Sequence, residues 1–535
     1  MTEIIHWVDV LSKKIIKNYK NINISTGITP SGDIHLGNLR EILTADFLYR
    51  SISNITNDTL FYYFADTFDP LRKVYPFLDE NIYKKYIGHP ISDIPCPCGK
   101  HKCYSDHFLD PFLSSINKLN IYPKVIKTDE LYKNGFFNNL IIQSLENKDK
   151  IKEIIEHITK KKIVNEWSPF NPLCKKCGRI NKSIVTGYNR EDMTIDYICD
   201  CGYSGTNNIS GGGKLTWRVE WPAKWKLFNI SVEPFGKDHA SSGGSYETGI
   251  HISKDIFHHE QPFPIKYEWI LLEDKGAMSS SSGVVISIKD MLKIVPPETL
   301  RYLIARTKPE KHIRFDPGLP ILNLIDEYET IKNKDDKTTY DNYIINLCKV
   351  DNNEKFNLKI PYKQILTIYQ ITDGNIELID NIFKKLNINI TKKELQNVIY
   401  YIKNWIETYA PKSIRFGIKK NYPNITLTYY QKSFLKILSN HICKNELEKP
   451  SQIKEFINNI NNENTDIYQE MQEEIKKYTT KNNIVRNKEL EIQKYIYESI
   501  YLILLGEKKG PKVDWFLVSI NKDFLVDRIN RAYKS

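Results

Sequence analysis

The C-terminal part of the chain, from about residue 332 onward, carries apolar residues at helical spacing. One stripe consists of Leu395, Val398, Ile399, Ile402 and Ile406, and a second of Ile453, Phe456, Ile457 and Ile460. Residues three and four apart share one face of a helix, so each stripe predicts an amphipathic helix packed on a core. Thr391-Lys392-Lys393-Glu394 precedes the first stripe and matches a capping box. We therefore predict an all-α region over residues 361–535.

The N-terminal part shows a different pattern, in which a strand, a glycine-rich turn and a helix follow one another. Residues 23–26 form a short strand-like run, 27–38 contain three glycines, and 39–48 have helical spacing. Such a turn lets backbone amides and a helix N-terminus face a phosphate. The spacing matches neither GxGxxG nor GxxxxGK[ST], which excludes the usual dinucleotide and P-loop motifs. An α/β nucleotide-binding domain of another kind is predicted.

The length of 535 residues exceeds what one hydrophobic core supports, so we expect roughly three to five units. No apolar run approaches the roughly 20 residues of a membrane-spanning helix, and residues 1–10 lack the pattern of a secretory or transit signal. We expect a cytoplasmic protein. The net charge of +11 favours polyanionic partners without proving one.

Seven of the nine cysteines fall into two tight groups. The second group comprises Cys174, Cys177, Cys199 and Cys201, arranged as Cys-Lys-Lys-Cys-Gly and Cys-Asp-Cys-Gly. Each short knuckle with its trailing glycine turns the backbone so that two thiolates converge on one ion. In a reducing compartment this pattern favours a structural zinc site over disulfides or redox cysteines.

The first group, within residues 95–107, offers five ligands for a four-coordinate site. We predict Cys96, Cys98, Cys103 and His107 as the set, with His101 as the likeliest substitute. A cysteine-rich loop without metal is the alternative. Neither group leaves an obvious open position, so both sites are expected to be structural rather than catalytic.

The turn at residues 27–38 contains His35-Leu36-Gly37-Asn38, preceded by Pro30-Ser31-Gly32. These residues resemble the first signature of the class I aminoacyl-tRNA synthetases. The resemblance implies that His35 and Asn38 contact ATP phosphates and ribose, and that Pro30 and Gly37 lie against the nucleotide. A side chain at Gly37 would intrude where adenine and ribose stack on the backbone.

Residues 275–284, Lys-Gly-Ala-Met-Ser-Ser-Ser-Ser-Gly-Val, resemble the second signature of that class, the Lys-Met-Ser-Lys-Ser loop. The resemblance places Met278, Ser279, Ser280 and Ser281 in catalysis, with Met278 also against ATP. The two signature lysines are replaced by Ala277 and Ser280, and Ser282 is uncharged as well. Losing one positioned donor of this kind can cost about 2.7 to 4 kcal/mol of barrier. Lys275 or bound magnesium can supply part of the missing positive charge.

Further segments resemble the class I lysyl-tRNA synthetases, among them residues 6–9, 69–74, 217–225, 233–249 and 297–317. The resemblance covers about residues 1–320. It implies that the amino-acid pocket is lined by Gly27, Thr29, Trp217, His239 and Tyr267, with Trp221 as an alternative to Trp217. Asp238 and His239 are expected beside the adenylate.

The resemblance implies a lysine–tRNA ligase that uses ATP, Mg²⁺ and two structural Zn²⁺ ions, with L-lysine and tRNA(Lys) as partners. The implied fold is a Rossmann-like α/β catalytic domain with a zinc-binding insertion, followed by an α-helical region that binds the anticodon. We predict catalytic halves at 1–85 and 211–305, an insertion at 86–210, a connecting tRNA-stem-contact region at 306–360 and the anticodon region at 361–535. The alternatives are a weakened or inactive tRNA-binding relative, or another class I synthetase.

Overall fold

The computed structural model describes residues 6–273, 276–277, 286–350, 358–460, 462, 464–481 and 492–534. The chain forms two compact units. The first contains residues 1–316 and 334–351, and the second contains residues 317–333 and 352–535. Among the described residues, no helix is long and apolar enough to cross a membrane.

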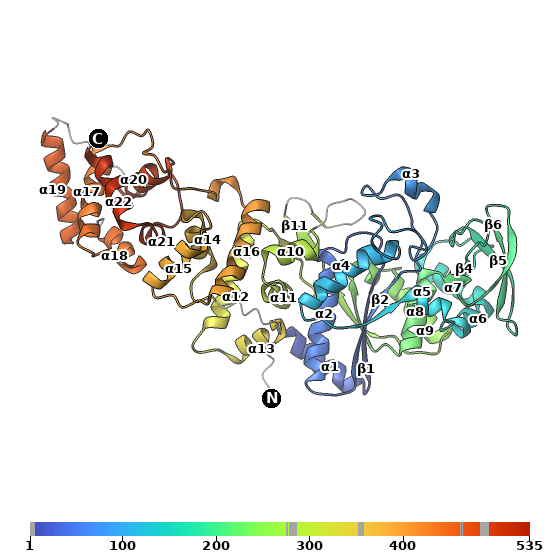
Figure 1. The fold of residues 1–535 in the computed structure, drawn as a ribbon. Coiled ribbons are helices and arrows are strands. Elements are labelled where there is room, and N and C mark those ends of the chain that lie inside the picture. Colours follow the sequence, from blue (N-terminus) through green and yellow to red (C-terminus); the bar gives the residue numbers. More distant parts are fainter. Residues whose placement is uncertain are drawn as a thin grey trace. The chain divides into compact units, whose positions relative to one another are not determined.

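A five-stranded parallel sheet organises the first unit (Figure 1). Its order is β10 (Phe263–Tyr267), β9 (Val232–Gly236), β1 (Ile22–Ile28), β2 (Thr59–Ala65) and β3 (Lys124–Lys127). From β1 the chain builds outward through β2 and β3, then returns to the other side of β1 with β9 and β10. The strand order therefore reverses between β1 and β9. In open α/β sheets, ligands bind beyond the carboxyl ends of the strands at this switch point.

The predicted strand, turn and helix at the N-terminus are confirmed as β1 and α2 (Leu36–Ser53). The helix is longer at both ends than the pattern suggested, because His35 caps its first turn. Buried Leu36, Leu39 and Leu43 bring α2 onto the sheet, where it contacts β1, β2 and β9. Apolar packing thus fixes the N-terminus of α2 beside the switch point.

Helices α8 (Trp217–Phe228) and α9 (Ser245–Asp255) flank β9 in the chain and pack together. The shared cluster contains Tyr62 and Phe64 of β2, Phe235 of β9, and Trp221, Trp225 and Tyr246 of the helices. This aromatic packing fixes α8, whose first residues reach the carboxyl end of the sheet.

Between β2 and β9 the chain forms α4 (Tyr104–Lys118), β3, α5 (Thr128–Lys133), α6 (Asn138–Glu146), α7 (Lys148–Thr159) and two small antiparallel sheets. One pairs β4 (Phe170–Pro172) with β8 (Gly213–Leu215). The other contains β5 (Ser183–Asn189), β6 (Thr194–Cys199) and β7 (Ser204–Asn208). The second sheet and its flanking turns, residues 174–208, are called the ribbon below.

After β10 the first unit continues through β11 (Ile270–Leu272), β12 (Gly276–Ala277) and β13 (Ile313–Phe315), which share a sheet. Helices α10 (Ile288–Ile294) and α11 (Pro297–Ala305) lie between β12 and β13, and α13 (Thr339–Cys348) packs on α11. The buried Arg40 of α2 donates hydrogen bonds to the carbonyl oxygens of Lys308, Pro309 and Lys311. One side chain of α2 thereby holds the segment before β13.

The described elements of the second unit are helices. They are α12 (Leu319–Asn333), α14 (Tyr362–Ile371), α15 (Ile376–Lys385), α16 (Lys392–Thr408), α17 (Tyr429–Cys443), α18 (Pro450–Ile460), α19 (Asp466–Lys481), α20 (Ile492–Leu505), α21 (Val513–Val518) and α22 (Lys522–Lys534), with a short 3₁₀ turn at Lys412–Ile414. The predicted capping box of α16 is confirmed, because the side chains of Thr391 and Glu394 each accept a hydrogen bond from the backbone N–H of the other residue. Leu395, Val398, Ile399 and Ile402 are buried, as is the predicted stripe of α18, whereas Ile406 is half-buried.

Candidate active site

A cavity of about 770 Å³ lies at the switch point of the sheet. The predicted residues that line it are Gly27, Thr29, His35, Gly37, Asn38, Trp217, Asp238, His239 and Tyr267. They come from the ends of β1, β9 and β10, the start of α2 and the start of α8. Pro30 is buried and is absent from the lining. The predicted loop residues Met278, Ser279, Ser280 and Ser281 lie outside the described residues.

The start of α2 carries the predicted nucleotide contacts. His35 Nδ1 accepts a hydrogen bond from Gly37 N at 3.1 Å, and Asn38 Oδ1 accepts one from His35 N at 3.3 Å. Burial lowers the pKa of His35 to about 4, so the ring is neutral. With Nδ1 accepting, the remaining proton sits on Nε2. The cap therefore leaves an N–H of His35 and the amide N–H groups of Asn38 as donors for a phosphate or ribose oxygen.

Glu41, one turn further along α2, also lines the cavity. Its carboxylate accepts hydrogen bonds from Gly27 N at 3.1 Å and from the Tyr267 hydroxyl at 2.5 Å. A Cβ at position 27 would lie 3.2 Å from the Phe64 carbonyl oxygen, a crowded approach, so glycine suits this position. Burial raises the pKa of Glu41 to about 8 against the lowering effect of both hydrogen bonds.

An aromatic wall forms another side of the cavity. Trp217 stacks on Trp221 with ring centroids 5.4 Å apart and planes 14° apart, and 40% of Trp217 remains exposed. Trp221 Nε1 donates to Glu233 Oε1 at 3.0 Å, which anchors the stack to β9. Trp217 is thus the ring that faces the cavity, whereas Trp221, the alternative, is buried behind it.

The carboxyl end of β9 presents Asp238 and His239. A Cβ at Gly236 would lie 2.5 Å from Asp238 Oδ1, so a larger residue at position 236 would displace the Asp238 side chain. His239 Nδ1 lies 2.8 Å from Ser245 Oγ, and burial lowers the pKa of His239. The Asp238 side chain is largely exposed at the cavity. These side chains stand opposite the start of α2 across the switch point.

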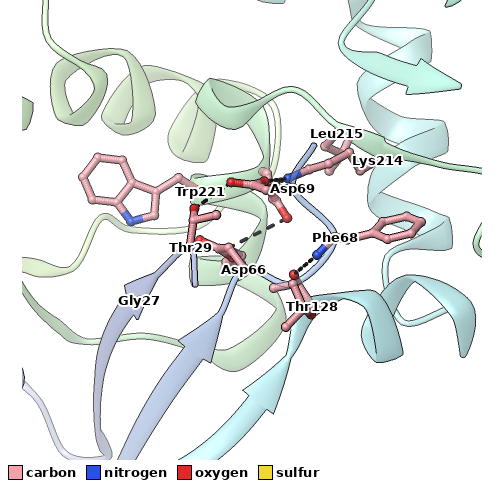
Figure 2. Close-up of polar contacts among 12 residues, drawn as sticks. Gly27, Thr29, Asp66, Phe68, Asp69, Thr128, Lys214, Leu215 and Trp221 are labelled. Carbon is pink, nitrogen blue, oxygen red and sulfur yellow. Dashed lines mark hydrogen bonds and ion pairs between the residues drawn. The ribbon is translucent and has the colours of Figure 1, made fainter. Parts of the chain in front are cut away.

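Beneath the cavity lies a buried cluster of three carboxylates and two lysines, called the ionic cluster below, part of which is drawn in Figure 2. Its members are Asp66, Asp69, Glu220, Lys214 and Lys224. Lys214 pairs with Asp69 and, at 2.8 Å, with Glu220 Oε2, while Lys224 pairs with Asp66. The Thr29 hydroxyl donates to Asp69 Oδ2 at 2.7 Å (Figure 2). Asp66, Asp69 and Lys214 also line the cavity.

The second cysteine group comes together in the ribbon. Cys174 Sγ lies 3.7 Å from Cys201 Sγ, and Cys177 Sγ lies 3.7 Å from Cys199 Sγ. All four sulfurs lie within 4.8 Å of one another. Zn–S bonds of about 2.3 Å in a tetrahedron place sulfurs about 3.8 Å apart. The geometry therefore fits the predicted tetrathiolate site.

The first group also comes together, with one correction to the predicted set. Cys96, Cys98 and His107 are joined by His101, and their ligand atoms lie within 4.8 Å of one another. Cys98 Sγ lies 3.3 Å from His101 Nδ1 and 3.2 Å from His107 Nδ1. Cys103 lies outside the group because it caps the start of α4 and is buried, with Sγ 3.1 Å from Ser105 Oγ.

Comparison with known proteins agrees with this geometry. The family model described as tRNA synthetases class I (K) matches residues 5–351. A lysine–tRNA ligase of Methanosarcina barkeri is 44% identical over 540 residues, covering 99% of this chain and 98% of that protein. Lysine–tRNA ligase 1 of Methanosarcina acetivorans is 42% identical over 98% of both chains. A lysine–tRNA ligase of Archaeoglobus fulgidus is 36% identical over 98% of this chain and 100% of its own length.

The chain belongs to the class I lysyl-tRNA synthetase family. Membership confirms the predicted enzyme class, a class I aminoacyl-tRNA synthetase. It also agrees with the parallel α/β sheet and with the place of the His35-Leu36-Gly37-Asn38 signature at the switch point.

Five charged residues on the cavity lining of this class I lysyl-tRNA synthetase are absent from the predicted site: Glu41, Asp66, Asp69, Arg72 and Lys214. Glu41 has a usable signal, since it follows the signature by one helical turn and so shares its face. Asp66 and Asp69 directly follow the apolar strand 59–65, a place where parallel sheets present ligands. Lys214 has no such signal, because it lies in the short strand β8 and reaches the cavity from outside the main sheet.

The corrected ligand set at the first cluster makes a testable prediction. We expect His101→Ala to remove one bound zinc ion per chain, because three donors remain where zinc needs four. Cys103→Ser should keep the zinc content unchanged, since that thiol faces Ser105. Zinc measured by atomic absorption on both purified proteins decides between them. Loss of zinc from Cys103→Ser with retention in His101→Ala would restore the original set.

Proposed function

We propose that this chain is a lysine–tRNA ligase that activates L-lysine with ATP and transfers the lysyl group to tRNA(Lys). The lysine carboxylate oxygen bonds to the ATP α-phosphorus, and the bond to the bridging oxygen breaks to release pyrophosphate. A terminal ribose hydroxyl of the tRNA then attacks the lysyl carbonyl carbon, and AMP leaves. The observation that supports this most is Glu41, an acidic side chain on the lining of the nucleotide cavity that pairs with no cation in the described part of the chain.

Glu41 is the best acceptor for the lysine side-chain ammonium. The cavity carboxylates Asp66 and Asp69 already pair with buried lysines, and Asp238 is largely exposed. Among the described residues no cation pairs with Glu41, which accepts only from Gly27 N and the Tyr267 hydroxyl. The exposed face of Trp217 can cover the aliphatic chain or the ammonium. A carboxylate that is shielded from water and has no cationic partner costs free energy, and a bound ammonium group offsets that cost by forming a charge-assisted hydrogen bond.

This assignment predicts a pH dependence for lysine binding. Burial raises the pKa of Glu41 to about 8, so below pH 8 the free enzyme holds this carboxyl protonated. An ammonium needs the ionised form, and the side-chain amine of free lysine stays charged up to about pH 10. The KM for lysine should therefore fall as pH rises from 6 to 8, by up to about tenfold per pH unit, and level off above. Pyrophosphate exchange across this range measures it; a lysine KM independent of pH would contradict the assignment.

For ATP, the protein supplies positioning and charge. The neutral His35 and the amide of Asn38 donate to phosphate or ribose oxygens, and Gly37 leaves room for the nucleoside. Mg²⁺ prefers phosphate oxygens, water and one or two carboxylates, and the exposed Asp238 fits that role. When bound, Mg²⁺ supplies charge neutralisation on the triphosphate. Arg72, exposed on the lining, offers a cation to the triphosphate, which is useful because the second signature lacks both of its lysines.

Each cysteine and histidine cluster fits a structural zinc ion. The ribbon offers four thiolates, and the other cluster offers two thiolates and two imidazole Nδ1 atoms at the spacing of a tetrahedral site. Neither set leaves an open position for a substrate. We therefore assign both ions to folding of the insertion rather than to the reaction.

Lysine-dependent exchange of pyrophosphate into ATP tests the function directly. We expect exchange with lysine and not with glutamate, arginine or cysteine. Exchange supported only by another amino acid would remove the lysyl assignment. If exchange is weak, Ser282→Lys distinguishes two causes. The added charge should raise the rate of pyrophosphate exchange if only the second signature is impaired, and should leave it unchanged if the active site is otherwise inactive.

The second unit offers a basic cavity that suits the tRNA. The cavity, about 930 Å³, lies between α14, the segment 412–419 and the loop 505–512. Its charged lining residues are Lys363, Lys412, Arg415, Lys419, Lys508, Lys509 and Lys512, against Glu507 alone. Part of this charge is engaged, since Arg415 donates to the Ala410 carbonyl and Lys512 pairs with Asp514. Lys508 and Lys509 are exposed on the loop and suit phosphates.

We assign this cavity to the anticodon arm of the tRNA, and it gives a salt-dependent prediction. The double variant Lys508→Ala/Lys509→Ala should weaken tRNA binding and reduce the slope of log K against log salt by about two. Pyrophosphate exchange without tRNA should stay unchanged. Lys392→Ala/Lys393→Ala is the matched control, because this exposed lysine pair in α16 lies outside the cavity. An equal loss of tRNA affinity in both double variants would mean that binding depends on overall positive charge rather than on this cavity, and would contradict the assignment.

A further inference from the structure

The ionic cluster borders the cavity, and one of its members, Asp69, binds the hydroxyl of Thr29 there. Asp69 connects Lys214 to Thr29: one of its carboxylate oxygens pairs with Lys214, and the other accepts a hydrogen bond from Thr29 Oγ1 at 2.7 Å (Figure 2). Burial alone would raise the pKa of Asp69, but Lys214 and the Thr29 hydroxyl outweigh it and hold the pKa below its usual value. Asp69 is therefore ionised and can only accept hydrogen bonds.

This arrangement fixes the direction of the Thr29 hydroxyl. A threonine hydroxyl has one proton to donate and two lone pairs to accept with. Because the proton is committed to Asp69, only the lone pairs of Thr29 Oγ1 remain for a ligand in the cavity. Such an oxygen suits an N–H group and repels a carboxylate or a phosphate oxygen. A hydroxyl free to rotate would not make this distinction.

Lys214 is held in place by its own backbone. It lies in β8, where it pairs with Asn171 of β4, and Leu215 N donates to the Tyr132 hydroxyl at 3.0 Å. A Cβ at Gly213 would lie 2.4 Å from the Asn171 carbonyl oxygen, so the strand needs glycine before Lys214. The side chain is buried, and the three carboxylates keep its pKa above the ordinary value despite burial. Lys214 is thus a rigid, permanently charged anchor for Asp69.

We propose that Lys214 is a positioning residue for the amino-acid substrate, which acts through Asp69 to make the Thr29 hydroxyl an obligate acceptor for an ammonium group of lysine. The proposal rests on the proposed function. Lysine carries two ammonium groups, and Glu41 is assigned the one on the side chain, so Thr29 receives the α-ammonium. The negative charge of Asp69, between Lys214 and Thr29, also repels the anionic groups of the substrates from this end of the cavity.

Lys224 provides a matched comparison within the same cluster. It is as buried as Lys214 and pairs with Asp66, but it neither lines the cavity nor contacts Asp69 or Thr29 in the described structure. Removing Lys214 leaves Asp69 unpaired and Glu220 with only its 3.9 Å contact to Lys224, and removing Lys224 leaves Asp66 unpaired, so both variants should lower the melting temperature. Only removal of Lys214 should release the Thr29 hydroxyl.

The test is steady-state pyrophosphate exchange on Lys214→Met, Lys224→Met, Thr29→Val and the double variant Thr29→Val/Lys214→Met. We expect Lys214→Met to raise the KM for lysine on the order of tenfold or more while the KM for ATP stays within about twofold. Lys224→Met should leave the lysine KM within about threefold. In the Thr29→Val background, Lys214→Met should add no further increase, because the two residues act in series.

Additive effects of Thr29→Val and Lys214→Met, or an equal rise in lysine KM for Lys224→Met, would overturn the proposal. If Lys214→Met does not fold, Lys214→Met/Asp69→Asn removes both charges together; a raised lysine KM in that variant supports the proposal, and an unchanged one overturns it. Failure of the wild-type chain to exchange with lysine would instead overturn the proposed function, so the two failures are distinguishable.

Discussion

Glu41→Gln should lower kcat/KM for lysine in pyrophosphate exchange by at least about 30-fold, because truncating one partner of a buried charge pair costs about 2–5 kcal/mol. Glutamine keeps the size but only one acceptor oxygen, so Gly27 N can keep its acceptor while the Tyr267 hydroxyl turns to accept from the new amide group. What it removes is the negative charge that an ammonium needs. The loss should appear mainly in the KM for lysine, since the contact is made equally in the ground and transition states.

The matched control is Glu268→Gln. Glu268 follows β10 directly after Tyr267, but it pairs with Lys237 and His312 and is absent from the cavity lining. Its replacement should leave the lysine KM unchanged. The pH dependence of the lysine KM should also vanish in Glu41→Gln and persist in Glu268→Gln. A raised ATP KM with an unchanged lysine KM in Glu41→Gln would place the side-chain ammonium elsewhere.

The cavity residues that the sequence revealed share one property: each stands beside an element with a strong local pattern. His35, Gly37 and Asn38 lie at the start of the largely buried helix α2, and Gly27 and Thr29 lie at the end of β1. Local propensity and the parallel-sheet rule are enough to bring such residues to one edge. Glu41 could have been found by the same reasoning, one helical turn further on.

The ionic cluster is harder to foresee because its members are far apart in the chain. Lys214 and Asp69 are 145 residues apart, and their meeting depends on how β8 returns from the insertion to the main sheet. Periodicity carries no information about such a return. A lysine in an apolar strand looks like a solvated residue until its three carboxylate neighbours are known.

The error at Cys103 has a similar cause. Spacing favours Cys96, Cys98, Cys103 and His107 and leaves His101 as the likeliest substitute, and only the start of α4 decides between Cys103 and His101. Cys103 caps that helix with an extended backbone and its side chain is buried, whereas His107 lies one turn further and faces the other ligands. The zinc ligands cannot be chosen from the sequence until the first residue of α4 is known.

Loss of zinc from the ribbon should unfold this segment and weaken lysine binding. The small core around its cysteines contains Cys174, Tyr197 and Cys199, with Cys177 and Tyr203 packed against them, and small sheets of this kind are marginal on their own. Two further ribbon residues, Ile180 and Ile195, pack into the larger core beside the main sheet. Zinc contributes about 10–16 kcal/mol in small zinc domains. We expect Cys199→Ser to lose one zinc ion per chain and to expose residues 174–208 to proteolysis. Cys443→Ser, at an exposed cysteine of α17, should do neither.

The effect should reach the cavity through a chain of backbone hydrogen bonds. Ile180 N donates to the Gly88 carbonyl at 2.8 Å, Gly88 N donates to the Leu71 carbonyl at 2.8 Å, and Ile91 N donates to the Asp69 carbonyl at 2.9 Å. Unfolding the ribbon removes the first of these supports and loosens the segment that carries Asp69. The lysine KM of Cys199→Ser should therefore rise more than its ATP KM. A variant that loses zinc but keeps both KM values would show that the ribbon folds independently of the amino-acid site.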